Sequence, residues 1–149
     1  MPLLTDDAIR LGDGRTLAYA EWGEPQGRCV FLFHGTPHSR LFCPDEAVTA
    51  SSNVRLVTVD RPGIGGSDVL PRRTLGDWPS DVVELADALE IEKFGVVGWS
   101  ANCSLVSTSW ATGARSFRLG LSTSPVNRTR PKARVEGEAH PRLRRLRPQ

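Results

Sequence analysis

The chain has 149 residues, which is room for one domain of ordinary size. With 39% apolar and 24% charged residues it has the composition of a globular protein, which excludes collagen-like, coiled-coil and wholly disordered chains. The net charge of +2 conceals an uneven distribution, because residues 1–110 carry 9 basic and 15 acidic side chains and residues 111–149 carry 10 and 2. We therefore expect a folded piece, 1–110, followed by a basic tail, 111–149.

The first predicted elements are two short strands joined by a tight turn. Residues 8–11 and 16–20 each contain apolar side chains, and the Gly-Asp-Gly run at 12–14 separates them. An Asp-Gly pair between two such segments is typical of a β-hairpin. The chain is therefore expected to open with an antiparallel pair.

Three further segments are predicted to be buried strands. Residues 29–33, 55–59 and 94–98 are short and almost entirely apolar runs, and polar or glycine-rich loops follow them. Short unbroken apolar runs are typical of strands that are buried on both faces, as in parallel sheets.

Two helices are predicted between these strands. Residues 39–50 show a weak helical pattern, whereas in residues 74–89 apolar side chains recur at helical spacing with acidic side chains between them. A hairpin followed by alternating strands and helices predicts an α/β domain. Its sheet is expected to be mostly parallel, with the N-terminal hairpin as an antiparallel edge.

The loop after the third buried strand carries the most specific motif. Ser100 lies within Gly-Trp-Ser-Ala-Asn, residues 98–102. A sharp strand-to-helix turn exposes a serine hydroxyl, and the N-terminus of the following helix favours developing negative charge. The turn needs small residues two positions before and after the serine, and Gly98 meets this requirement whereas Asn102 does not. The motif predicts a nucleophile, and the alternative interpretation is a helix-capping serine.

The loop after the first buried strand, His-Gly-Thr-Pro at 34–37, complements that serine. This position supplies one backbone N–H of an oxyanion hole, and the residue after the nucleophile supplies the other. The two donors would therefore be the amides of Thr36 and Ala101.

A third loop, Asp-Arg-Pro-Gly-Ile-Gly-Gly-Ser-Asp at 60–68, follows the second buried strand. Its glycines permit tight turns, and Asp60 and Asp68 are expected to brace the loop rather than to act as catalytic acids. The loop has neither the glycine spacing nor the lysine of a phosphate-binding loop, so we expect no nucleotide cofactor.

Together these three motifs resemble the first half of an α/β-hydrolase with a serine nucleophile, closest to the esterase- and peptidase-like group. The resemblance covers residues 8 to about 101, with the motifs in the right order and separation. It implies hydrolysis of a small ester or related acyl bond. Ser100 would attack the carbonyl, and the amides of Thr36 and Ala101 would hold the oxyanion. A serine rather than an aspartate at this position differs from the dehalogenase and epoxide-hydrolase branches.

The resemblance ends after the serine. Members of the family continue with Gly-Gly and a helix of small residues, where this chain has Asn-Cys-Ser-Leu-Val at 102–106. The family also places an acid and then a histidine late in the chain. The histidines of this chain are His34, His38 and His140. The first two belong to the oxyanion loop, where we expect structural roles, and the third follows two glutamates in the basic tail.

The tail, residues 111–149, has four prolines and one aromatic side chain, Phe117, so its composition predicts disorder. The change of composition coincides with the loss of the family pattern. This coincidence favours a frameshift, a wrong splice boundary or a truncated gene model. We therefore expect little or no catalysis and poor solubility.

Two other functions remain open from the sequence. One alternative is that the chain is a non-catalytic binding or regulatory fragment that pairs with a complementary half. The other alternative is nucleic-acid binding through the Arg-Leu-Arg-Arg-Leu-Arg run at 142–147, but the acidic first piece and the lack of interleaved aromatics argue against this partner.

The remaining sequence features concern membrane association, cysteine pairing and metal binding. No run reaches the roughly 18 apolar residues of a membrane helix, and the N-terminus has no signal-peptide pattern. The three cysteines, Cys29, Cys43 and Cys103, form no C-x-x-C pair, which argues against a disulfide framework or a zinc site. We expect a cytoplasmic chain with no membrane partner, no metal and no cofactor, whose partner is a small ester or acyl substrate.

Overall fold

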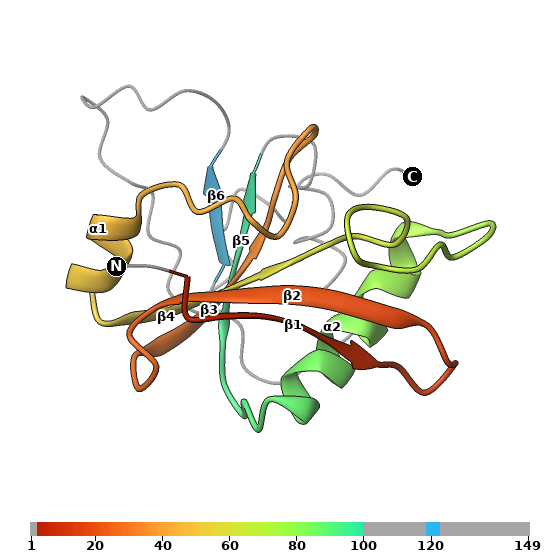
Figure 1. Ribbon diagram of the computed structural model, residues 1–149, viewed down its shortest axis with the longest axis horizontal. Coiled ribbons are helices and arrows are strands. Elements are labelled where there is room, and N and C mark those ends of the chain that lie inside the picture. Colours follow the sequence, from red (N-terminus) through yellow and green to blue (C-terminus); the bar gives the residue numbers. More distant parts are fainter. Residues whose placement is uncertain (1–2, 100–118, 123–149) are drawn as a thin grey trace, which may run out of the picture.

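A computed structural model describes residues 3–99 and 119–122, which form one mixed sheet with helices beside it (Figure 1). The strands are β1 (Thr5–Arg10), β2 (Thr16–Gly23), β3 (Arg28–Phe33), β4 (Val54–Val59), β5 (Gly95–Trp99) and β6 (Leu119–Ser122). The helices are α1 (Glu46–Ser51), a 3₁₀ turn (Leu75–Asp77) and α2 (Trp78–Ala88). No helix within these ranges is long and apolar enough to cross a membrane.

The strands lie in the order β1-β2-β4-β3-β5-β6. β1 pairs antiparallel with β2, and β2 pairs antiparallel with β4. The remaining pairs, β4 with β3, β3 with β5 and β5 with β6, are all parallel. The predicted α/β class with an antiparallel N-terminal edge is therefore confirmed. The strand β6 falls within the segment 111–149.

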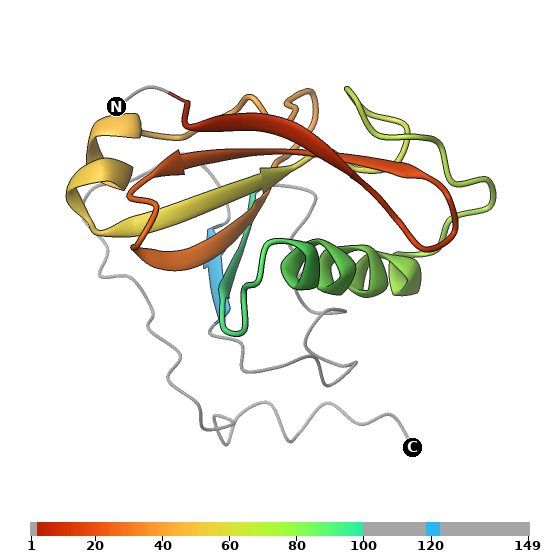
Figure 2. The same ribbon diagram turned by 60° about the horizontal axis from the view of Figure 1, so that its bottom comes forward.

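The first face of the sheet carries the larger core. Because side chains alternate along a strand, every second residue of the central strands points to this face. Helix α2 covers it, as Figure 2 shows below the sheet. The fully buried side chains here include those of Leu17, Phe31, Phe33, Val57, Val59, Trp78 and Leu85. Phe33 meets the ring of Trp78 edge-on, with 5.2 Å between the ring centroids. Strand β3 and helix α2 are thereby packed directly together.

The start of α2 follows from local sequence. The Asp77 carboxylate accepts hydrogen bonds from the backbone N–H and the hydroxyl of Thr74, at 2.6 and 2.8 Å. Pro79 lies in the first turn, where its missing N–H costs no helical hydrogen bond. The helix predicted at 74–89 is confirmed, with the 3₁₀ turn as its first part.

The second face has a smaller core, and here one prediction is wrong. The helix expected over 39–50 is reduced to α1, which begins after Asp45. The Asp45 carboxylate caps the helix by accepting from the N–H of Val48 at 2.9 Å. Pro44 disfavours helical backbone at the residue before it. Residues 39–43 instead form a turn and irregular backbone, and Phe42 packs with the second-face side chains of the strands.

Helix α2 and the 3₁₀ turn before it offer a matched test of the packing on the first face. Leu85→Ala removes a fully buried side chain, and we expect it to lower the free energy of unfolding by about 2–5 kcal/mol. Leu75→Ala makes the same change at a side chain that is 52% exposed, and should cost less than about 1 kcal/mol. Urea denaturation of both variants measures the difference. Equal losses would contradict the burial pattern described above.

Candidate functional site

The candidate site lies where three parallel strands end side by side. Phe33 of β3 pairs with Gly98 of β5, and Leu32 of β3 pairs with Thr58 of β4. The three motif loops leave the carboxyl ends of these strands, at one edge of the sheet. The chain passes from β3 to β4 on one side and then to β5 on the other side of β3. In open α/β sheets, ligands bind at such a reversal of strand order.

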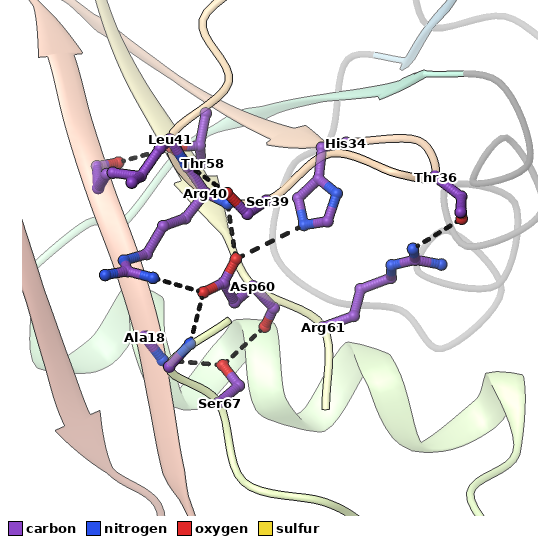
Figure 3. Close-up of polar contacts among 12 residues, drawn as sticks. Ala18, His34, Thr36, Ser39, Arg40, Leu41, Thr58, Asp60, Arg61 and Ser67 are labelled. Carbon is purple, nitrogen blue, oxygen red and sulfur yellow. Dashed lines mark hydrogen bonds and ion pairs between the residues drawn. The ribbon is translucent and has the colours of Figure 1, made fainter. Parts of the chain in front are cut away.

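Asp60, the first residue after β4, connects two of the three loops (Figure 3). Its carboxylate is fully buried and accepts hydrogen bonds from the Arg40 backbone N–H at 2.6 Å and from the Arg40 side chain at 2.7 Å. It also accepts from the N–H of Gly66 at 2.9 Å. The bracing role predicted for Asp60 fits these contacts.

The loop after β4 is shaped to fit around that carboxylate. A Cβ atom on Gly65 would lie only 2.0 Å from the Asp60 side chain, and Gly65 has a positive φ of 53°. Any larger residue would displace the carboxylate and strain the backbone. The Ser67 hydroxyl donates to the Asp60 carbonyl and accepts from the N–H of Ala18 in β2, both at 2.9 Å. The loop is therefore fastened to β2 as well.

Arg40 is the residue of this network that sequence reasoning missed. Besides its two bonds to Asp60, its side chain bonds Asp6 of β1 at 2.7 Å. The bond to Asp6 is the main cause that raises the pKa of Arg40, with Asp60 adding to it against the opposing effect of burial. The Arg40 carbonyl accepts from the Thr58 hydroxyl of β4. No local pattern signals Arg40, because its partners lie 20 and 34 residues away.

His34, the first residue after β3, is fully buried beside Asp60. Its Nδ1 lies 3.1 Å from the carbonyl of Gly35, and since a carbonyl can only accept, Nδ1 carries the hydrogen. Its Nε2 lies 3.8 Å from the Asp60 carboxylate. Burial is the main cause that lowers the pKa of His34, and the Asp60 charge opposes it. The ring is therefore neutral at pH 7, which suits the structural role expected for it.

Thr36 is exposed at the tip of the same loop, where its hydroxyl accepts a hydrogen bond from the Arg61 side chain at 3.1 Å. The structure thus places one of the two predicted oxyanion donors at the edge where β3 and β5 end. Ser100 and Ala101 lie outside the described residues, as does His140. Their predicted roles, and that of the Thr36 amide, stay predictions.

On the second face of the sheet, aromatic side chains lie beside the loop that follows β3. His38 stacks on Phe42 with 4.1 Å between ring centroids, and Phe42 meets Trp99 edge-on at 5.9 Å. Trp99 is the residue before Ser100 in the sequence.

Within residues 3–99 and 119–122, no group of three His, Cys, Asp or Glu side chains is arranged to hold a metal ion.

Solved structures with the same architecture identify the fold. A proposed aryl esterase from Burkholderia cenocepacia aligns with a TM-score of 0.59 and 26% identity, over 74% of this chain and 42% of its own. An α/β-hydrolase from Sphaerobacter thermophilus aligns with a TM-score of 0.65 and 23% identity, over 77% and 44%. This is part of an α/β-hydrolase fold.

An epoxide hydrolase from Vigna radiata has the same fold at 18% identity, with a TM-score of 0.63 over 80% of this chain and 37% of its own. The chain thus spans less than half the length of these three α/β-hydrolase structures. Comparison with protein-family models and with curated proteins gave no match. The α/β-hydrolase resemblance found in the sequence is confirmed at the level of the fold.

The Asp60 network predicts a large cost for Asp60→Asn. The amide has one acceptor oxygen instead of two and leaves the partly buried Arg40 without its charged partner at this position. We expect the free energy of unfolding to fall by about 2–4 kcal/mol. Asp68→Asn makes the same change at an exposed carboxylate that accepts from the N–H of Thr16, and should cost less. Urea denaturation compares the two, and an equal loss would refute the bracing role.

The burial of His34 predicts a pH dependence of stability. Because the pKa of His34 in the folded chain is below its ordinary value near 6.5, the unfolded state binds more protons between these two values. Stability should therefore be fully present above pH 6.5 and decline as the pH falls through that window. His34→Gln should remove this component. NMR titration of the His34 ring checks the pKa directly, and a midpoint at or above 6.5 would contradict the prediction.

Proposed function

We propose that this site hydrolyses a small carboxylic ester or related acyl bond, with Ser100 as the nucleophile and the amides of Thr36 and Ala101 as oxyanion donors. The observation that carries the proposal is the strand register, which brings the ends of β3, β4 and β5 together at the reversal of strand order. The aryl-esterase assignment of one structural neighbour supports this choice. Ester hydrolysis is favoured over epoxide opening because a serine follows Trp99.

In the proposed reaction the Ser100 oxygen bonds to the substrate carbonyl carbon while a base removes the hydroxyl proton. The ester C–O bond then breaks, and the alcohol leaves with a proton. Water attacks the acyl-serine in the second half, which releases the carboxylic acid and restores the hydroxyl. Two N–H groups stabilise the oxyanion that forms each time. The Asp60–Arg40 contacts support this step, because they fix the loop that carries Thr36 before substrate binds.

The general base has the least support among the proposed catalytic groups. His34 is buried with its Nδ1 on the Gly35 carbonyl, which does not suit a proton shuttle for a substrate. His140 follows Ser100 and two glutamates in the expected order, but in a segment whose composition predicts no packed core. An oxyanion hole without the base retains only about 10³–10⁴-fold catalysis over water. We therefore propose slow turnover for the 149-residue chain.

A boronic acid tests the nucleophile without requiring that base. Its boron accepts the serine oxygen and becomes tetrahedral while the hydroxyl proton passes to water, and the resulting anion mimics the oxyanion intermediate. With phenylboronic acid, ¹¹B NMR should show a tetrahedral signal for the full chain and none for Ser100→Ala. The control Ser80→Ala changes an exposed serine of α2 and should keep the signal.

Two outcomes would count against the proposal. Absence of the tetrahedral signal in the folded full chain would refute the role of Ser100. Fast hydrolysis of p-nitrophenyl acetate that disappears in both Ser100→Ala and His140→Ala would instead confirm the nucleophile and overturn the proposal of slow turnover.

A further inference from the structure

Three aromatic rings meet where β3 and β5 end, on the second face of the sheet. His38 and Phe42 belong to the loop after β3, and their rings stack with 4.1 Å between centroids and an interplanar angle of 20°. Trp99 is the last residue of β5 and meets Phe42 edge-on at 5.9 Å. We call these three side chains the aromatic cluster. It connects the loop that carries Thr36 to the strand that leads to Ser100.

The aromatic cluster lies beside both groups of the proposed reaction. Trp99 directly precedes Ser100, and consecutive Cα atoms of a chain are only about 3.8 Å apart. His38 follows Thr36 by two residues, and its N–H donates to the carbonyl of Gly35 at 2.9 Å, which closes a tight turn around Thr36. A substrate whose carbonyl reaches the Thr36 amide therefore lies next to the aromatic cluster.

The rings of the aromatic cluster are only partly covered, since all three side chains are half-buried. By contrast, the aromatic pair on the first face, Phe33 and Trp78, is fully buried. Apolar surface that stays accessible gains free energy when a ligand covers it. A ring on the ligand gains more than an aliphatic group of the same size, because aromatic rings attract one another in stacked and edge-to-face arrangements. The aromatic cluster therefore favours an aromatic ligand.

We propose that His38, Phe42 and Trp99 form a specificity-determining subsite that binds an aromatic ring in the acyl group of the substrate. The preferred substrate is then an ester of an arylalkanoic acid, with a short aliphatic spacer between ring and carbonyl, because the rings lie beside the proposed carbonyl position. The inference rests on the proposed function, in which Ser100 and Thr36 locate the acyl carbon and its oxygen. The acyl group stays bound through both half-reactions, so these contacts act in each of them.

Two boronic acids of equal carbon number test this inference on the full chain. 2-Phenylethylboronic acid carries an aromatic ring, and 2-cyclohexylethylboronic acid is its saturated counterpart with the same surroundings at boron. The cyclohexyl group is the more apolar, so simple burial favours it. We expect instead that the phenyl probe has an about fivefold lower dissociation constant, as aromatic pairing predicts. Titration followed by ¹¹B NMR measures both constants. In Phe42→Leu the ratio should fall to about one or below.

A matched control separates a local subsite from a general effect on the fold. Phe94→Leu makes the same change at a buried ring of the first-face core, just before β5 begins and thus at the opposite end of that strand from Trp99. It should leave the fivefold ratio in place. Since Phe42 also packs with the second-face core, the melting temperatures of both variants are compared with that of the wild type. His38→Gln changes a loop side chain and should lower the ratio in part.

The outcomes distinguish this inference from the proposed function. If the wild type binds the cyclohexyl probe as tightly as the phenyl probe, the inference is overturned and the nucleophile stays intact. A ratio that survives in both Phe42→Leu and His38→Gln, or that falls equally in Phe94→Leu, would also overturn it, because the preference would then not come from the aromatic cluster. Failure of the folded chain to form a tetrahedral adduct with either probe would refute the proposed function and this inference with it.

Discussion

A single buried carboxylate holds the candidate site together. Removing Asp60 from water carries a penalty of several kcal/mol, which hydrogen bonds to the charged oxygens must offset. Arg40 and Gly66 provide those bonds, and they belong to the loops after β3 and β4. The two loops are therefore fixed relative to each other whenever the charge is satisfied. The position of Thr36, four residues before Arg40, depends on this constraint.

The sheet determines which loops the carboxylate can join. β3 has a parallel neighbour on each side, so the residues that follow β3, β4 and β5 begin at the same edge. Both faces of these strands are covered, by α2 on one side and by the segment around Phe42 on the other. Their sequences can therefore be almost continuously apolar, and polar residues collect at the strand ends. The polar residues lie at the carboxyl ends of these strands because the strands themselves are buried on both faces.

The separation of buried apolar strands from polar loops explains which features could be predicted from the sequence and which could not. The strands at 29–33, 55–59 and 94–98 were predictable because full burial demands short apolar runs, and helix α2 was predictable from its apolar stripe. The helix expected over 39–50 was not confirmed, since Phe42 packs with the second core and the helix starts only at the Asp45 cap. Arg40 was missed because long-range ion pairs have no local spacing. The proposed role of Ser100 rests on the sequence motif alone, because Ser100 lies outside the described residues.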